Sequence, residues 1–179
     1  DKQIEAVLGG HVAVLIEAIA NHAQKQNINM YMVGGVVRDL FLNRPNLDID
    51  LVLEADAINF ARSLCDILGG EINSHRPFGT ATWILDEGVA NKLQVELATL
   101  PDHIDFATSR NEFYDHPTAL PSVYSSSIKL DLLRRDFTMN TLAIQLSPER
   151  SANRLLDFYG GFNDLQNKTI RVLHSLSFV

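Results

Sequence analysis

One segment constrains the fold more than any other part of the chain. It runs from Met30-Tyr31-Met32-Val33 through Gly34-Gly35-x-x-Arg38-Asp39 and a turn at 43–46 to Asp48-x-Asp50. The apolar run at 30–33 predicts a short strand that the double glycine ends, and residues 36–42 predict a helix. The alternation across 47–53 predicts a second strand with both aspartates on one face. The segment therefore predicts strand, helix and strand in close succession.

The same segment carries the residue types that phosphate and metal chemistry needs. Gly34 and Gly35 let an anion approach the backbone N–H groups at a helix N-terminus, where the helix dipole favours it. Arg38 lies in the first turn of that helix and could reach the same phosphates. Asp48 and Asp50 would repel each other unless a divalent cation lay between them. A phosphate cradle beside a carboxylate pair is typical of metal-assisted nucleotidyl transfer.

The rest of the chain predicts an α+β fold with one sheet. We expect helices at 4–26 (split by Gly9-Gly10), 57–68 (capped by Asp56), 127–133 and 137–142, and a short one after Gly160-Gly161. We expect strands at 71–74, 80–85, 93–98, 103–107 and 169–173, a hairpin of 143–146 with 155–158, and a long polar loop at 109–126.

A third carboxylate would complete the predicted metal site, and two residues compete for this role. Asp105 lies between the apolar residues Ile104 and Phe106, on the polar face of its predicted strand. Glu96, in Val95-Glu96-Leu97, is the alternative. We favour Asp105.

A second block runs from Asp131 to Ala143 and includes Arg134-Arg135-Asp136 and Asn140. A guanidinium from Arg134 or Arg135 matches phosphate oxygens with two hydrogen bonds. Asp136 and Asn140 have the spacing i, i+4, which predicts one shared helix face that could hold a ribose or orient an arginine. The alternative is a charged helix surface with internal salt bridges.

Other conspicuous residues favour structural roles. The block Asp157-Phe158-Tyr159-Gly160-Gly161 is expected to be a strand-to-helix corner packed through its glycines. Trp83 is expected in the core, and the histidines show no metal-ligand spacing.

Composition narrows the class of protein. A chain of 179 residues that is 46% hydrophobic predicts a folded globular unit. No apolar run reaches the roughly 18–20 residues of a membrane span, so no membrane partner is expected. The lone Cys65 excludes an internal disulfide, and we expect a cytoplasmic location. The net charge of −7 is unfavourable for RNA binding unless basic surface lies outside this chain.

Together these blocks resemble the class II tRNA nucleotidyltransferase and bacterial poly(A) polymerase family, within the polymerase β-like nucleotidyltransferase superfamily. The resemblance extends from Tyr31 to Val179 and is carried by the segments 33–39, 48–50, 105–110, 134–140 and 156–161, with further likeness at 117–121 and 170–174. It implies a mixed sheet with helices packed mainly on one side. It also implies an N-terminal helical segment at 1–28 and a nucleotidyltransferase head domain at 29–179.

The resemblance also implies an enzyme and a role for each matching residue. Asp48, Asp50 and Asp105 would be catalytic and hold two Mg²⁺ ions. The nucleotide-binding residues would be Gly34, Gly35, Arg38, Asp39, Arg134, Arg135, Asp136 and Asn140. The reaction would be template-independent transfer of a nucleotide from CTP or ATP to an RNA 3′ hydroxyl, as in CCA-end or A addition to tRNA, with poly(A) synthesis as the alternative.

In this family a helical neck, a body and a tail follow the head, and the neck selects the base. The chain begins without Met and ends on apolar residues, so we expect the natural protein to continue and to bind RNA largely through those domains. Two other hypotheses stay open on the residues alone: nucleotide transfer to a small molecule or protein, and a non-catalytic nucleotide-binding module.

Overall fold

A seven-stranded mixed sheet forms the centre of the computed structural model, which describes residues 2–113 and 122–174, with the backbone alone for 110–113 and 122–125. The helices are α1 (Lys2–Leu8), α2 (Gly10–Lys25), α3 (Gly35–Phe41), α4 (Ala57–Leu68), α5 (Glu87–Leu93), α6 (Ile128–Leu133) and α7 (Gly161–Gln166). The strands are β1 (Met30–Val33), β2 (Asp50–Leu53), β3 (Glu71–His75), β4 (Thr80–Ile84), β5 (His103–Thr108), β6 (Arg110–Phe113), β7 (Ser122–Ser125), β8 (Ala143–Ser147) and β9 (Arg154–Leu156). The predicted α+β fold is confirmed.

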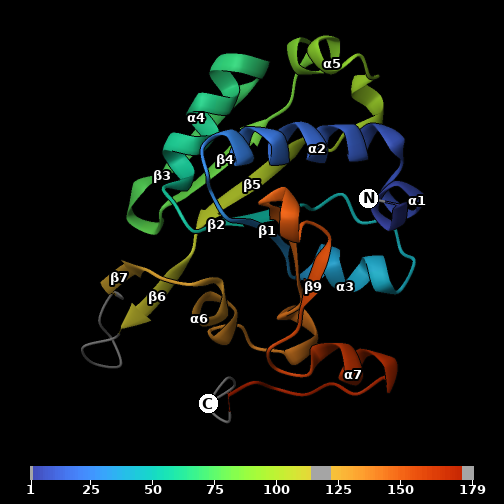
Figure 1. Cartoon of the computed structure of the whole chain (residues 1–179), viewed down its shortest axis with the longest axis vertical. Coiled ribbons are helices and arrows are strands. Elements are labelled where there is room, and N and C mark those ends of the chain that lie inside the picture. The colour runs from blue at the N-terminus through green and yellow to red at the C-terminus, as the bar shows by residue number, and fades with distance from the viewer. Residues whose placement is uncertain (1, 114–121, 175–179) are drawn as a thin grey trace.

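The strand order is β3-β4-β5-β2-β1-β8-β9, with β2 and β5 parallel and the other described neighbours antiparallel. The predicted hairpin of 143–146 with 155–158 is present as β8 and β9. β6 and β7 form a separate two-stranded sheet beyond the end of β5, which Figure 1 shows below the main sheet.

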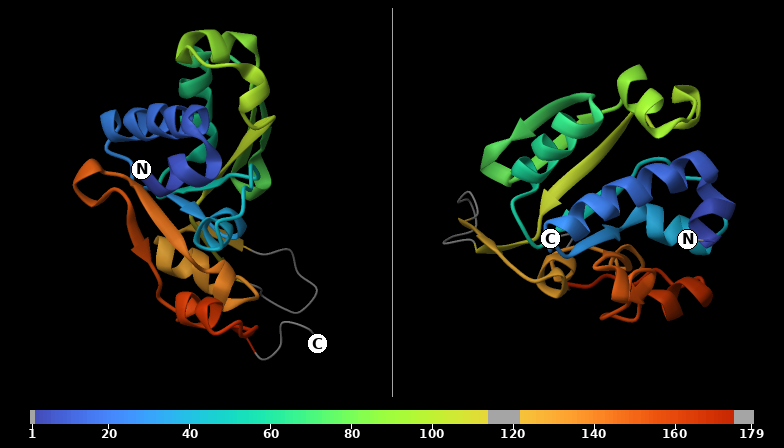
Figure 2. Two further views of the ribbon diagram at one scale, coloured as in Figure 1. Left: turned by 90° about the vertical axis from the view of Figure 1, so that its right-hand side faces the viewer. Right: turned by 45° about the horizontal axis from the view of Figure 1, so that its top comes forward.

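The two faces of the sheet are covered unequally. Helices α1, α2 and α4 pack with the main core on one face, around large buried side chains such as Trp83, Phe60 and Phe106 (Figures 1 and 2). On the other face α6 covers a smaller cluster at β1, β2 and β8 through Ile128 and Leu132. Helices therefore pack mainly on one face of the sheet. The cluster under α6 covers only part of the opposite face.

Several predicted elements are wrong. The expected strand at 93–98 is the end of α5 followed by a 3-10 helix at Leu97–Thr99. The expected helix at 137–142 is one 3-10 turn, Thr138–Asn140, and the expected strand at 169–173 contributes a single bridge from Val172 to Phe137. The polar segment 109–126 holds β6 and β7. The likeness noted at 117–121 lies outside the described residues.

Candidate active site

Two carboxylates lie side by side on the sheet face opposite the main core. Leu51 and Leu53 of β2 enter that core, so strand alternation turns Asp50 toward the other face. The parallel pairing of β2 with β5 sets Asp50 directly beside Asp105. Thr82, the β4 partner of Asp105, donates its hydroxyl to Asp105 Oδ1. The sheet itself therefore brings two of the predicted metal ligands together.

Asp48 joins this group together with a residue that sequence reasoning missed. Asp48 is exposed and precedes β2, which begins only at Asp50, so the predicted strand at 47–53 starts too early. Asp48, His103 and Asp105 offer ligand atoms within 4.8 Å of one another, a group that could hold a metal ion. His103 Nε2 lies 3.6 Å from Asp105 Oδ2. The feature that could have indicated His103 is the register between β2 and β5. The offset that pairs Asp50 with Asp105 also aligns Asp48 with His103.

The double glycine meets Arg135 at the N-terminus of α3. Gly34 caps the helix with φ 77° and ψ −134°, and its N–H donates to the Leu142 carbonyl at 3.1 Å. A Cβ atom on Gly34 would lie 2.7 Å from Nη1 of Arg135. The backbone conformation favours glycine here, and a side chain would have to displace the Arg135 guanidinium. Gly34 and Arg135, which are far apart in the sequence, are therefore neighbours in the structure.

A buried carboxylate, Asp131, anchors both arginines. Its side chain is fully buried, and Arg134 Nη2 lies 3.2 Å from Oδ1 while Arg135 Nη2 lies 4.0 Å from Oδ2. Sequence reasoning assigned Asp131 no role. The signal was its spacing of i+3 and i+4 to the two arginines, which places all three on one side of a helical turn.

The carboxylates and the arginines line one cavity of about 340 Å³. Asp50, Asp105 and Thr82 form part of its wall, and Arg134 and Arg135 form another part. The same cavity is thus lined by oxygen ligands for a hard cation and by guanidinium donors for phosphate. The cavity has the two halves that a metal-bound triphosphate needs.

Burial and neighbouring charges shift the pKa values of two side chains that line this cavity, Asp50 and Arg135. Burial raises the pKa of the Asp50 carboxyl, and the nearby Asp48 and Asp105 raise it further, while Arg135 opposes the shift. Burial lowers the pKa of the Arg135 guanidinium, and Asp131 and Asp50 oppose that change. The carboxylate group therefore carries repulsion that a bound cation would relieve.

The remaining predicted nucleotide-binding residues are arranged differently from the expectation. Arg38 donates to both oxygens of Asp39 and to the side chain of Asn140, so its guanidinium is held by protein groups. Asp136 is exposed and precedes the 3-10 turn, so it shares no helix face with Asn140. That prediction is wrong because the segment makes a single tight turn, whose Thr138 Oγ1 donates to the buried Asp164.

The glycine corner at 157–161 has the structural role that was expected. The Asp157 carboxylate accepts hydrogen bonds from the backbone N–H groups of Gly161 and Phe162 at the start of α7. The alternative third carboxylate, Glu96, lies on no strand but precedes the 3-10 helix at Leu97–Thr99. Trp83 is fully buried, as expected.

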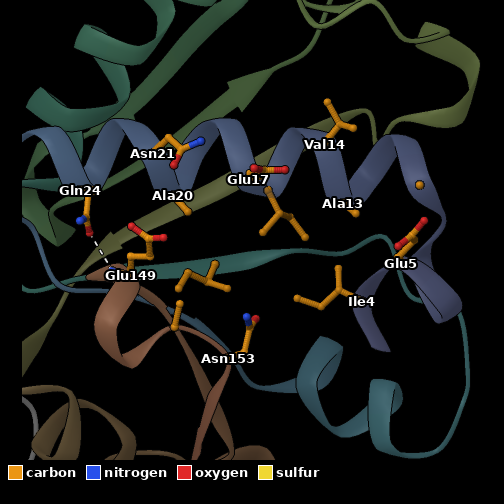
Figure 3. Close-up of a pocket in the computed structure, with 14 residues that line it drawn as sticks. Ile4, Glu5, Ala13, Val14, Glu17, Ala20, Asn21, Gln24, Glu149 and Asn153 are labelled. Carbon is orange, nitrogen blue, oxygen red and sulfur yellow. Dashed lines mark hydrogen bonds between the residues drawn. The ribbon is translucent and has the colours of Figure 1, made fainter. Parts of the chain in front are cut away.

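A second cavity, of about 330 Å³, lies on the main-core side of the sheet between α2 and the turn that joins β8 to β9 (Figure 3). Glu5, Glu17 and Glu149 surround it, and Gln24 Oε1 accepts a hydrogen bond from the Glu149 backbone N–H. It shares no lining residue with the carboxylate cavity.

Comparison with known families identifies the chain. A family model described as the poly A polymerase head domain matches residues 30–171. The chain belongs to this family. The match includes β1, the double glycine, the three aspartates and the arginine pair, and it ends just before the last described residues.

Relatives with high sequence identity act on tRNA according to their names. The A-adding tRNA nucleotidyltransferase of Geobacter sulfurreducens is 46% identical over 84% of this chain and 16% of its own length. That of Halalkalibacterium halodurans is 39% identical over 92% of this chain and 35% of its own length. The chain thus spans about a sixth to a third of these two curated relatives.

Solved structures agree with the fold. A CCA-adding enzyme in an apo form superposes with a TM-score of 0.83 at 39% identity, covering 99% of this chain and 38% of that one. The Thermotoga maritima CCA-adding enzyme complexed with tRNA gives a TM-score of 0.78 at 37% identity, covering 99% and 36%. Complexes of a CCA-adding enzyme with CTP and with ATP each give a TM-score of 0.77 at 36% identity.

Within residues 2–113 and 122–174, no helix is long and apolar enough to cross a membrane.

Proposed function

We propose that the protein containing this chain transfers a nucleotide from ATP or CTP to the 3′ hydroxyl of tRNA. The observation that carries the proposal is that one cavity is lined both by Asp50 and Asp105 and by Arg134 and Arg135. The names of similar proteins support this proposal. They include A-adding tRNA nucleotidyltransferases at 46% and 39% identity, and CCA-adding enzymes solved with tRNA, CTP and ATP.

Asp48, Asp50 and Asp105 would hold Mg²⁺. The donor set fits, since Mg²⁺ prefers carboxylate oxygens, and burial, with Asp48 and Asp105 adding to it, raises the pKa of the Asp50 carboxyl, so a bound cation would favour its charged form. His103 lies at the outer end of the group, beside Asp105. When bound, Mg²⁺ would lower the pKa of the attacking 3′ hydroxyl and stabilise the leaving pyrophosphate.

The chain's own residues would orient the triphosphate. The backbone at Gly34 and Gly35 would donate N–H groups to phosphate oxygens at the N-terminus of α3. Arg135, and Arg134 beside it, would neutralise the phosphates, with Asp131 accepting hydrogen bonds from Arg134 and lying 4.0 Å from Arg135. No protein nucleophile is required, because the RNA hydroxyl attacks the α-phosphate directly.

The test is nucleotide incorporation by the full-length protein. Three tRNA preparations, ending before the CCA sequence, after its first C or after its second C, would each be incubated with Mg²⁺ and labelled CTP or ATP. An A-adding enzyme extends only the CC-ended tRNA, with ATP, and a CCA-adding enzyme extends all three. Absence of incorporation into every tRNA would contradict the proposal.

Poly(A) synthesis is the second candidate, because the matching family model is described as a poly A polymerase head. It predicts repeated AMP addition to an unstructured RNA of unrelated sequence. Product length on a denaturing gel separates it from the addition of one A. The cytoplasmic location stays a prediction.

A further inference from the structure

A chain of hydrogen bonds joins the 3-10 turn at Thr138–Asn140 to the loop that carries Asp48. Arg38 Nη1 donates to Asn140 Oδ1 at 3.0 Å, and Arg38 Nε and Nη2 donate to the two Asp39 oxygens at 2.8 and 2.9 Å. Asn46 Nδ2 donates to Asp39 Oδ2 at 2.8 Å, and Asn46 Oδ1 accepts from the Asp48 backbone N–H at 2.9 Å. We call this chain the polar relay.

Asp48 depends on such a contact because the sheet holds it poorly. Its side chain is exposed, and the β2 ladder begins two residues later, at Asp50. On the C-terminal side, Ile49 is 2% exposed and its carbonyl accepts from the Asp105 N–H at 3.1 Å. On the N-terminal side, the Asn46 side chain closes an Asx-turn onto the Asp48 N–H. Asn46 therefore holds the backbone on the N-terminal side of Asp48, which the β2 ladder does not reach.

The Arg38–Asp39 pair forms the centre of the polar relay. The Arg38–Asp39 pair is bidentate and charge-assisted, and the two side chains are only 28% and 14% exposed. The pair lowers the pKa of the Asp39 carboxyl, which Asn46 lowers further, so Asp39 stays an acceptor. Gly35 lies beneath, with its Cβ position 3.7 Å from Arg38 Nη2 and 3.8 Å from Asn46 Nδ2. Arg38 therefore connects the 3-10 turn to the loop before β2, and its expected role as a phosphate ligand stays a prediction.

We propose that Asn46 is a positioning residue for Asp48, held in place by Arg38 and Asp39, and that the relay couples the turn at Asn140 to the metal-binding loop. The proposal rests on the assignment of Asp48 to a metal in the proposed function. Partners that orient metal ligands typically contribute about 10- to 100-fold to metal affinity or activity.

The direct test is Mn²⁺ affinity of the full-length protein, measured by electron paramagnetic resonance without nucleotide. Asn46→Ala should weaken Mn²⁺ binding by about 10-fold or more. Asn140→Ala, at the far end of the relay, should weaken it by a smaller factor. Asn46→Ser, whose hydroxyl can still accept from the Asp48 N–H, should recover part of the loss. The matched control is Asn91→Ala, an exposed asparagine of α5, which should bind Mn²⁺ as the wild type does.

Thermal unfolding of every variant would establish that each one is folded. If Asn46→Ala binds Mn²⁺ as tightly as Asn91→Ala does, the relay proposal is overturned. Asp48→Ala separates that failure from failure of the proposed function. Loss of Mn²⁺ binding in Asp48→Ala, with wild-type binding in Asn46→Ala, rejects only the relay. Wild-type binding in Asp48→Ala as well rejects both.

Discussion

At the scale of single residues, the site depends on one backbone position that only glycine can occupy. Gly34 combines φ 77° with ψ −134°, and the guanidinium of Arg135 fills the space that a side chain would take. Gly35, the next residue, has no positive φ, and its Cβ position makes only ordinary contacts. A side chain at Gly34 would therefore meet an unfavourable backbone conformation and the Arg135 guanidinium, whereas one at Gly35 would meet neither. Substituting each glycine in turn tests this difference.

Gly34→Ala should lower the free energy of unfolding by about 1–3 kcal/mol and displace Arg135 from the cavity. Because Arg135 would hold phosphates, KM for the nucleotide should rise about tenfold or more. Gly35→Ala should change the free energy of unfolding far less, because its Cβ position makes only ordinary contacts. Chemical denaturation and steady-state kinetics on the full-length protein measure the two effects. Equal behaviour of the two variants would contradict the role given to Gly34.

Asp50 predicts a pH-dependent stability effect. Its folded-state pKa is raised by burial and by Asp48 and Asp105, so its charge disfavours folding once pH rises through the unfolded-state pKa. In EDTA at pH 7, Asp50→Asn should therefore raise the melting temperature above that of the wild type. At a pH below the unfolded-state pKa the difference should vanish, since Asp50 is then neutral in both states.

Differential scanning fluorimetry across pH checks this expectation. Asp102→Asn, an exposed aspartate before β5, is the control and should show no such pattern. A lower melting temperature for Asp50→Asn at pH 7 would show that the carboxylate stabilises the metal-free fold.

At the scale of elements, the errors have identifiable causes. Residues 93–97 alternate apolar and polar and so imitate a strand, but the Asp86 side chain accepts from the Val89 N–H and starts α5. Gln94 ends that helix in the left-handed conformation. The local capping signal at Asp86 outweighs the alternation. At 137–142 the spacing predicted a helix. In the structure, hydrogen bonds from the Thr138 hydroxyl to the Asp164 carboxylate and from the Thr138 N–H to the Arg171 carbonyl hold this segment against α7.

The corner before α7 supports the 3-10 turn from below. A Cβ atom on Gly161 would lie 2.2 Å from the Thr138 carbonyl oxygen, so the turn must shift to accept it. Gly161→Ala should therefore lower stability by about 1–3 kcal/mol, in the range of overpacking, and reduce incorporation because Asn140 moves with the turn.

Gly10→Ala provides the matched control, since Gly10 is also the first residue of a helix but has no atom within 4 Å of its Cβ position. That change should be neutral or stabilising by up to about 1 kcal/mol. Urea denaturation of both variants measures the difference. Similar stabilities for the two would contradict the packing role of the corner.

At the scale of the whole molecule, the sequence selected candidate site residues by type and local spacing, and the fold determines how they are arranged. Asp48, Asp50, Asp105 and Arg135 were found from residue type and local spacing, and the structure brings them together. His103 and Asn46 were not found, because their roles depend on the parallel register of β2 with β5 and on a loop that folds back onto α3. Such long-range pairings leave no periodic signal in a single sequence.

The charge of the chain predicts how the head behaves alone. With a net charge of −7, residues 1–179 should bind nucleoside triphosphate weakly in Mg²⁺ and add almost no nucleotide to tRNA. The relatives are several times longer, which leaves room for RNA-binding surface elsewhere. Calorimetric titration with ATP and an incorporation assay on the isolated head check this. Efficient incorporation by residues 1–179 would contradict it.

The central claim is that Asp50 and Asp105 on one sheet face, together with Asp48 in the loop before β2, carry metal-dependent nucleotide addition. The most direct measurement is the rate of labelled ATP or CTP incorporation into tRNA by full-length Asp48→Ala, Asp50→Ala and Asp105→Ala in Mg²⁺, with Asp102→Ala as the control. We predict a loss of roughly 100-fold or more for Asp48→Ala and Asp50→Ala, a clear loss for Asp105→Ala, and wild-type rates for Asp102→Ala. Incorporation at the wild-type rate by Asp48→Ala or Asp50→Ala would contradict it.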